Sequence, residues 1–201
     1  MTLHYVSCAF AVVLYAVPVV AGSPPTPVTA VLIPDSRYSP MAIREMGREA
    51  AGILKHSGVT LRWRFGPSAQ VSNGRLIVVR LRGECEMDGE SAVMQKGALG
   101  WSHQVNGAIL PFTDLACDNI RGAIQSADLN ERHEQANMLL GRAMGRVLAH
   151  EVYHIVADTP EHGKDGVAQS ALSARELTSG QLELRPSDVE AIQSGLRQSG
   201  R

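Results

Sequence analysis

Two histidines and a glutamate in the second half of the chain have the spacing of a metal site. His150, Glu151 and His154 form the pattern H-E-x-x-H. If this segment is helical, the two imidazoles lie on one face, about one turn apart, and both can reach a single Zn²⁺ ion. The glutamate between them can then accept a proton from a water molecule at the metal. The pattern therefore predicts a zinc-dependent hydrolase, most simply a peptidase.

The residues before this pattern indicate a helix with the histidines on its inner side. Apolar residues recur at helical spacing (Ala136, Leu140, Ala143 and Val147), and the two histidines continue the same stripe. A pattern with only three fixed positions also occurs by chance on surface helices, which is the alternative interpretation. The helical phase favours metal binding, because it directs the imidazoles toward the core.

A catalytic zinc ion needs a third protein ligand and an open position for water. His162 and Glu176 are the two main candidates downstream of the pattern. We predict His162, because imidazole is the commoner zinc donor and the turn-forming residues 158–160 favour a sharp return of the chain. Glu176 is the alternative ligand, and Asp158 and Glu161 are weaker carboxylate candidates.

Two further side chains could contribute to such a site. Tyr153 could stabilise an oxyanion, although its helical phase differs from that of the histidines and favours a packed position. His103 could line the cleft if its strand borders the metal, and an ordinary surface or packed histidine is the alternative.

The N-terminus has the character of a secretory leader. Residues 6–20 are almost entirely apolar, and small residues precede Gly22. We predict a signal peptide at residues 1–21, a Pro-rich tether at residues 22–27 and a single metalloprotease-like domain at residues 28–201. The protein would be exported, either secreted or periplasmic. An uncleaved membrane anchor is the alternative, which the short apolar run and Pro18 disfavour.

The composition argues against nucleic acid as a partner. The 201 residues have a formal net charge of −1, and aromatic residues make up 4% of them, so neither a cationic field nor a base-stacking surface is expected. We expect a peptide or protein substrate, no membrane span once the leader is removed, and a monomer.

The cysteines indicate a disulfide. Cys8 lies in the predicted leader, which leaves Cys85 and Cys117. An even pair in an exported protein favours one disulfide, and two reduced cysteines are the alternative. Neither cysteine has C-x-x-C spacing, so we do not expect them to bind zinc.

Apolar patterns predict mainly strands in the first half of the chain and helices in the second, typical of an α+β domain. Strands are predicted at residues 28–33, 60–65 and 75–81, a hairpin at 99–112 about Asn106-Gly107, and helices at 39–58, 120–127, 131–156 and from 186 onward. The small mixed, twisted sheet should pack on the N-terminal helix and on the helix with the metal pattern, with a closing C-terminal helix.

Residues 150–166, which read HEVYHIVADTPEHGKDG, resemble the zinc segment of metzincin-type zinc metalloproteases. They are similar to small exported bacterial metzincin-like proteins, in which the third histidine lies two residues further on than in H-E-x-x-H-x-x-G-x-x-H. The likeness extends through residues 140–149 and 184–192, and residues 99–103 resemble the edge strand along which such enzymes hold an extended substrate.

This resemblance implies a metzincin-like fold and peptide-bond hydrolysis. It also implies His150, His154 and His162 as zinc ligands and Glu151 as the general base. Substrate would bind along the edge strand by β-augmentation.

The chain departs from the family pattern at two positions. Ala157 occupies the place of the turn glycine, and Ala168 stands about where the family's methionine turn would be, since no methionine follows Met144. That methionine is a packing residue rather than a ligand, so zinc binding can survive its loss. The alternative function is therefore a catalytically weak or inactive, zinc-stabilised peptide-binding module.

Overall fold

The computed structural model describes residues 25–66, 74–87, 97–125 and 133–198. They form a mixed α+β domain with a five-stranded sheet and five α-helices, which confirms the predicted class. The strands are β1 (Thr26–Pro34), β2 (Val59–Phe65), β3 (Arg75–Arg82), β4 (Gly100–Val105) and β5 (Ala108–Ala116). The helices are α1 (Pro40–Leu54), α2 (Cys117–Gln125), α3 (His133–Ala157), α4 (Ala174–Thr178) and α5 (Pro186–Gln198).

The sheet has the order β2-β1-β3-β5-β4. The first four strands in this order are parallel, and β4 is antiparallel to β5. The predicted hairpin turns at Asn106 and Gly107, which both have positive φ, as a type I′ turn requires. β4 is the last strand in the order of the sheet and therefore forms one of its two edges.

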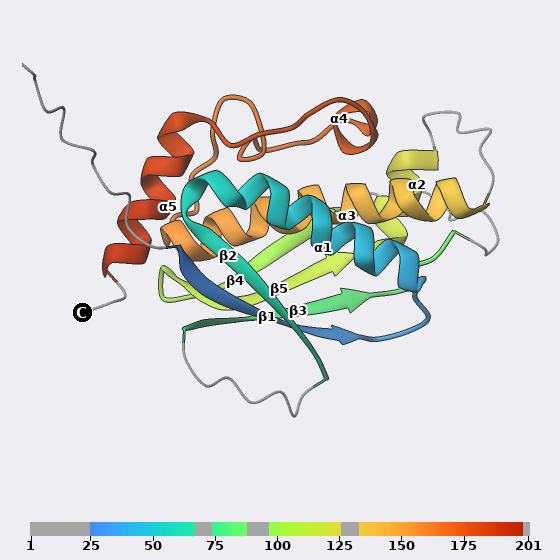
Figure 1. Cartoon of the computed structure of the whole chain (residues 1–201), viewed down its shortest axis with the longest axis horizontal. Coiled ribbons are helices and arrows are strands. Elements are labelled where there is room, and N and C mark those ends of the chain that lie inside the picture. Colours follow the sequence, from blue (N-terminus) through green and yellow to red (C-terminus); the bar gives the residue numbers. More distant parts are fainter. Residues whose placement is uncertain (1–24, 67–73, 88–96, 126–132, 199–201) are drawn as a thin grey trace, which may run out of the picture.

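Helices α1 and α3 cross the same face of the sheet, and α5 lies at one end of α3 (Figure 1). The predicted apolar stripe of α3 is buried, since Ala136, Leu140, Ala143 and Val147 are each at most 9% exposed. At Gly141, a Cβ atom would come within 2.4 Å of the Ala42 carbonyl oxygen. The close approach of α1 to α3 therefore depends on the absence of a side chain there.

Two arginines fix the segments that follow α3. The Arg146 side chain is 2% exposed, pairs with Glu49 of α1, and donates to the Ser179 and Gly180 carbonyls. Arg75 at the start of β3 donates to the carbonyls of Val156 in α3 and Gly195 in α5. These bonds join the C-terminal segment to α3 and the sheet.

Cys85 and Cys117 form a disulfide with a Cα–Cα distance of 5.0 Å, as the even cysteine pair predicted. Both residues are buried. The bond ties the segment after β3 to the first residue of α2, which packs beside α3.

Several boundaries differ from the prediction, among them the end of α1 at Leu54 and the end of β5 at Ala116. β1 begins at Thr26, so Thr26 and Pro27 pair with β2 rather than belonging to the tether. Cys117 begins α2 instead of lying in a loop, and Ser187 lies inside α5 rather than capping it. For β1, pairing with β2 extends the strand two residues before its apolar run.

The predicted signal peptide at residues 1–21 and residues 22–24 of the predicted tether lie outside the described residues. So do residues 126–127 of the predicted 120–127 helix and residues 131–132 of the predicted 131–156 helix. Among the helices that are described, none combines the length and the apolar character needed to cross a bilayer.

Candidate metal centre

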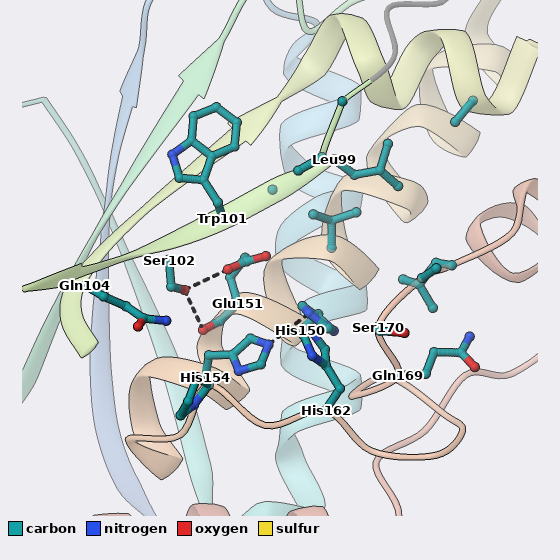
Figure 2. A pocket seen from close by; sticks show the side chains of 18 residues that line it. Leu99, Trp101, Ser102, Gln104, His150, Glu151, His154, His162, Gln169 and Ser170 are labelled. Carbon is teal, nitrogen blue, oxygen red and sulfur yellow. Dashed lines mark hydrogen bonds between the residues drawn. The ribbon is translucent and has the colours of Figure 1, made fainter. Parts of the chain in front are cut away.

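Helix α3 places His150 and His154 side by side, with their Nε2 atoms 3.0 Å apart (Figure 2). Each ring is oriented through its other nitrogen. His150 Nδ1 donates to the Val167 carbonyl at 2.8 Å, and His154 Nδ1 donates to the Thr159 carbonyl at 2.7 Å. Because a carbonyl can only accept, the proton of each neutral ring is on Nδ1 and the lone pair is on Nε2.

Both imidazoles are neutral in this environment. Burial lowers the pKa of His150 to about 4, and burial also lowers the pKa of His154. The two Nε2 lone pairs therefore face each other with no proton between them. A cation removes this repulsion, and two nitrogens on one tetrahedral zinc ion are about 3.4 Å apart at the usual bond length of about 2.1 Å.

His162 completes the cluster from the loop after α3. Its ring centroid is 5.2 Å from that of His150 and 4.8 Å from that of His154. The candidate ligand atoms of the three histidines all lie within 4.8 Å of one another. His162 is exposed, and within the described parts of the chain no side-chain hydrogen bond orients its ring.

The backbone returns His162 to the helix. α3 ends at Ala157, and the next residue, Asp158, has a positive φ of 50° and so takes the left-handed conformation usually given to glycine. The chain therefore turns directly after Ala157 without a glycine. The loop is then closed by a bond from the Gly163 amide to the carbonyl of Ala168, a buried residue.

The other candidates for the third ligand are carboxylates that lie elsewhere in the structure. Glu176 is in the capping box of α4, where it accepts from Ser173, and it also accepts from Gln169. The Asp158 carboxylate accepts from the Ile109 amide at the hairpin. Glu161 is an exposed loop residue. None of these carboxylates belongs to the histidine cluster.

Glu151 is buried between α3 and the edge strand, at 4% exposure. The Ser102 hydroxyl lies 2.7 Å from Glu151 Oε2 (Figure 2). Burial raises the pKa of Glu151 to about 7, although the hydrogen bonds from Ser102 act in the opposite direction. A carboxyl group with this pKa can take up and release a proton near neutral pH.

A cavity of about 560 Å³ opens beside these residues. Its polar side contains the three histidines and Glu151, and β4 forms one wall. The remaining wall is largely apolar, formed by Leu99, Ala123, Val147, Ala171 and Leu172. The arrangement combines a cation site, a proton acceptor and space for an organic side chain.

His103 and Tyr153 lie outside this arrangement. His103 Nε2 is 2.5 Å from Asp114 Oδ2 on β5, and it does not line the cavity. Tyr153 is 5% exposed and packs in the core, with its ring 5.2 Å from that of His154. Tyr153 thus takes the packed position that its helical phase favours, whereas His103 is half-buried and pairs with Asp114.

Sequence reasoning missed the contacts that orient the site. Ser102 and the carbonyls of Thr159 and Val167 carry no local signal, because each contact joins segments that only the fold brings together. The chain matches no known protein-family model, and no curated protein shows significant sequence similarity to it.

Proposed function

We propose that this protein is a zinc-dependent endopeptidase with a metzincin-like arrangement of its site. The convergence of His150, His154 and His162 beside Glu151 is the observation that carries this proposal. Three imidazoles are a common donor set for catalytic zinc and leave a fourth position open. When bound, zinc acts as a Lewis acid and lowers the pKa of water toward neutrality.

The protein's own residues then have defined tasks. The two helix histidines are oriented by the carbonyls of Val167 and Thr159, so their Nε2 lone pairs are available as donors. Glu151 accepts a proton from the attacking water and later delivers it to the leaving amine. Its pKa near 7 suits both steps.

The edge strand provides a place for an extended peptide. The Leu99 carbonyl accepts from the Ala116 amide, and the Trp101 carbonyl accepts from the Thr113 hydroxyl, so both point toward β5. By strand alternation, the backbone groups of Gly100 and Ser102 face the open edge. A substrate that pairs there can place one side chain in the adjacent cavity.

Export belongs to the same proposal. The predicted leader and the Cys85–Cys117 disulfide both suit an oxidising compartment outside the cytosol. A secreted or periplasmic peptidase would have both features.

The test combines metal content with peptide cleavage. Purified full-length protein should contain about one zinc ion per chain by elemental analysis, and H150A and H154A should lose it. A peptide library should be cleaved by the zinc-loaded protein, chelation should abolish cleavage, and added zinc should restore it. Zinc binding without cleavage would instead support the zinc-stabilised peptide-binding module. A protein that binds no zinc contradicts both functions.

A further inference from the structure

Ser102 on the edge strand contacts the Glu151 carboxylate through its hydroxyl, and its backbone also acts on this carboxylate. Its Oγ lies 2.7 Å from Glu151 Oε2 and 3.3 Å from the Glu151 backbone carbonyl. With Glu151 at 4% exposure, bulk water has little access to replace this contact. The position of the carboxylate therefore depends on a residue 49 positions away in the sequence.

The edge strand is shaped to bring this hydroxyl onto α3. At Gly100, a Cβ atom would lie 2.7 Å from Val147 Cγ1 and 3.1 Å from Glu151 Oε1. Gly100 and Ser102 point to the same face of β4, because side chains alternate along a strand. Gly100 thus permits β4 to approach α3 closely, and this approach brings the Ser102 hydroxyl to the Glu151 carboxylate.

We propose that Ser102 is a positioning residue for Glu151, an inference that rests on the proposed peptidase function. A carboxylate attached through flexible torsions has several orientations in a cavity, and the Ser102 bond selects one of them. A hydroxyl can donate to the ionised carboxylate and accept from the protonated acid.

A purely structural role for Ser102 makes different predictions. If the hydroxyl only holds β4 against α3, its loss lowers stability and substrate binding together. If it positions the base, its loss lowers kcat and leaves KM and zinc affinity almost unchanged, since misplaced catalytic groups cost about 10- to 100-fold in rate.

The experiment uses full-length, zinc-loaded protein with three variants. S102A should reduce kcat about 10- to 100-fold with KM within about twofold, and S102T, which keeps a hydroxyl, should recover most of this loss. V105A is the matched control on the same strand, 53% exposed and outside the cavity, and should behave like the parent. A kcat for S102A within twofold of the parent overturns the proposal, as does an equal loss in S102A and S102T.

The double variant S102A/E151Q separates the two roles further. If Ser102 acts through Glu151, the residual rate of the double variant should equal that of E151Q alone. An additional loss of more than about threefold in the double variant would indicate an independent role and overturn the proposal.

A readout without turnover keeps this inference distinct from the peptidase proposal. The ¹³C carboxyl resonance of Glu151 should shift in S102A and return toward the parent value in S102T. If the zinc-loaded parent cleaves no peptide, the peptidase function is contradicted. The carboxyl resonance alone then tests whether Ser102 positions the Glu151 carboxylate. An unchanged resonance in S102A overturns it, and a shifted one supports it.

Discussion

Glu151 and Asp114 are both buried carboxylates, and they contact neighbouring residues of one strand, Ser102 and His103. Asp114 is 0% exposed, and Glu151 is 4% exposed. Asp114 alternates along β5 with Leu115, a core residue, so the two carboxylates lie on opposite faces of the hairpin. Both side chains are shielded from solvent, but their surroundings shift their pKa values in opposite directions.

The difference has two sources: Glu151 lies deeper in the protein than Asp114, and Asp114 has arginine partners that Glu151 lacks. Burial by itself raises the pKa of both carboxyl groups. At Asp114, hydrogen bonds from Arg80 and His103 outweigh burial, and the pKa is lowered. At Glu151 the partner is a neutral hydroxyl, and the pKa stays raised, at about 7. Asp114 is thus held ionised as a structural anchor, whereas Glu151 can exchange a proton.

Removing the ionisable group of Glu151 gives the sharpest test of this contrast. E151Q should lower kcat by about 10²- to 10⁴-fold, the usual contribution of a general base, while zinc content remains at the parent level. Peptide cleavage and elemental analysis measure these quantities. E190Q, on the exposed side of α5, is the matched control and should retain full activity. Parent-like turnover by E151Q would show that another group is the base.

The same variant should change how stability depends on pH in the metal-free protein. Because the folded pKa of Glu151 is about 7, against an ordinary value of 4.5, folded protein binds this proton more tightly than unfolded protein. The parent should therefore lose stability relative to E151Q as pH rises from about 4.5 to about 7, by up to about 3 kcal/mol. Urea unfolding at a series of pH values measures the difference. A constant difference across this range would contradict the raised pKa.

D114N should have its main effect on stability. It removes the charged partner of Arg80 and His103 and should lower the free energy of unfolding at pH 7 by about 1–3 kcal/mol, with zinc content unchanged. The advantage of the parent over D114N should shrink as pH falls below the ordinary aspartate value of 3.8, because the folded pKa is lowered. This sign is opposite to that for Glu151. An advantage that grows with acid would refute the comparison.

The smallest effect is expected for H103Q. Arg80 Nε still contacts Asp114 Oδ1 at 2.5 Å, and Arg82 lies 3.6 Å from the same oxygen, so both arginine partners are retained. We expect a loss of about 0.5–1 kcal/mol in the free energy of unfolding at pH 7 and no loss of zinc. A loss as large as that of D114N would mean that His103, rather than Arg80, dominates the surroundings of Asp114.

Several features were predictable because they follow from local periodicity. The buried stripe of α3 and the shared face of His150 and His154 need only the 3.6-residue helical repeat. Ser39 and Pro40 begin α1, and Asn106 and Gly107 form the hairpin turn, through backbone preferences of the residues themselves. The donor type of His162 and the turn residues before it predict this residue as the third ligand. The structure places it in the histidine cluster.

The chain alone thus determined which residues could donate to a metal and which helix would carry two of them. Only the tertiary structure decided which carboxylate would be able to change its charge. That outcome depends on burial and on partners such as Ser102 and Arg80, which are 49 and 34 positions away from their carboxylates. Electrostatic and desolvation effects act through space, so they are defined only once the sheet has set its strand order and β4 lies against α3.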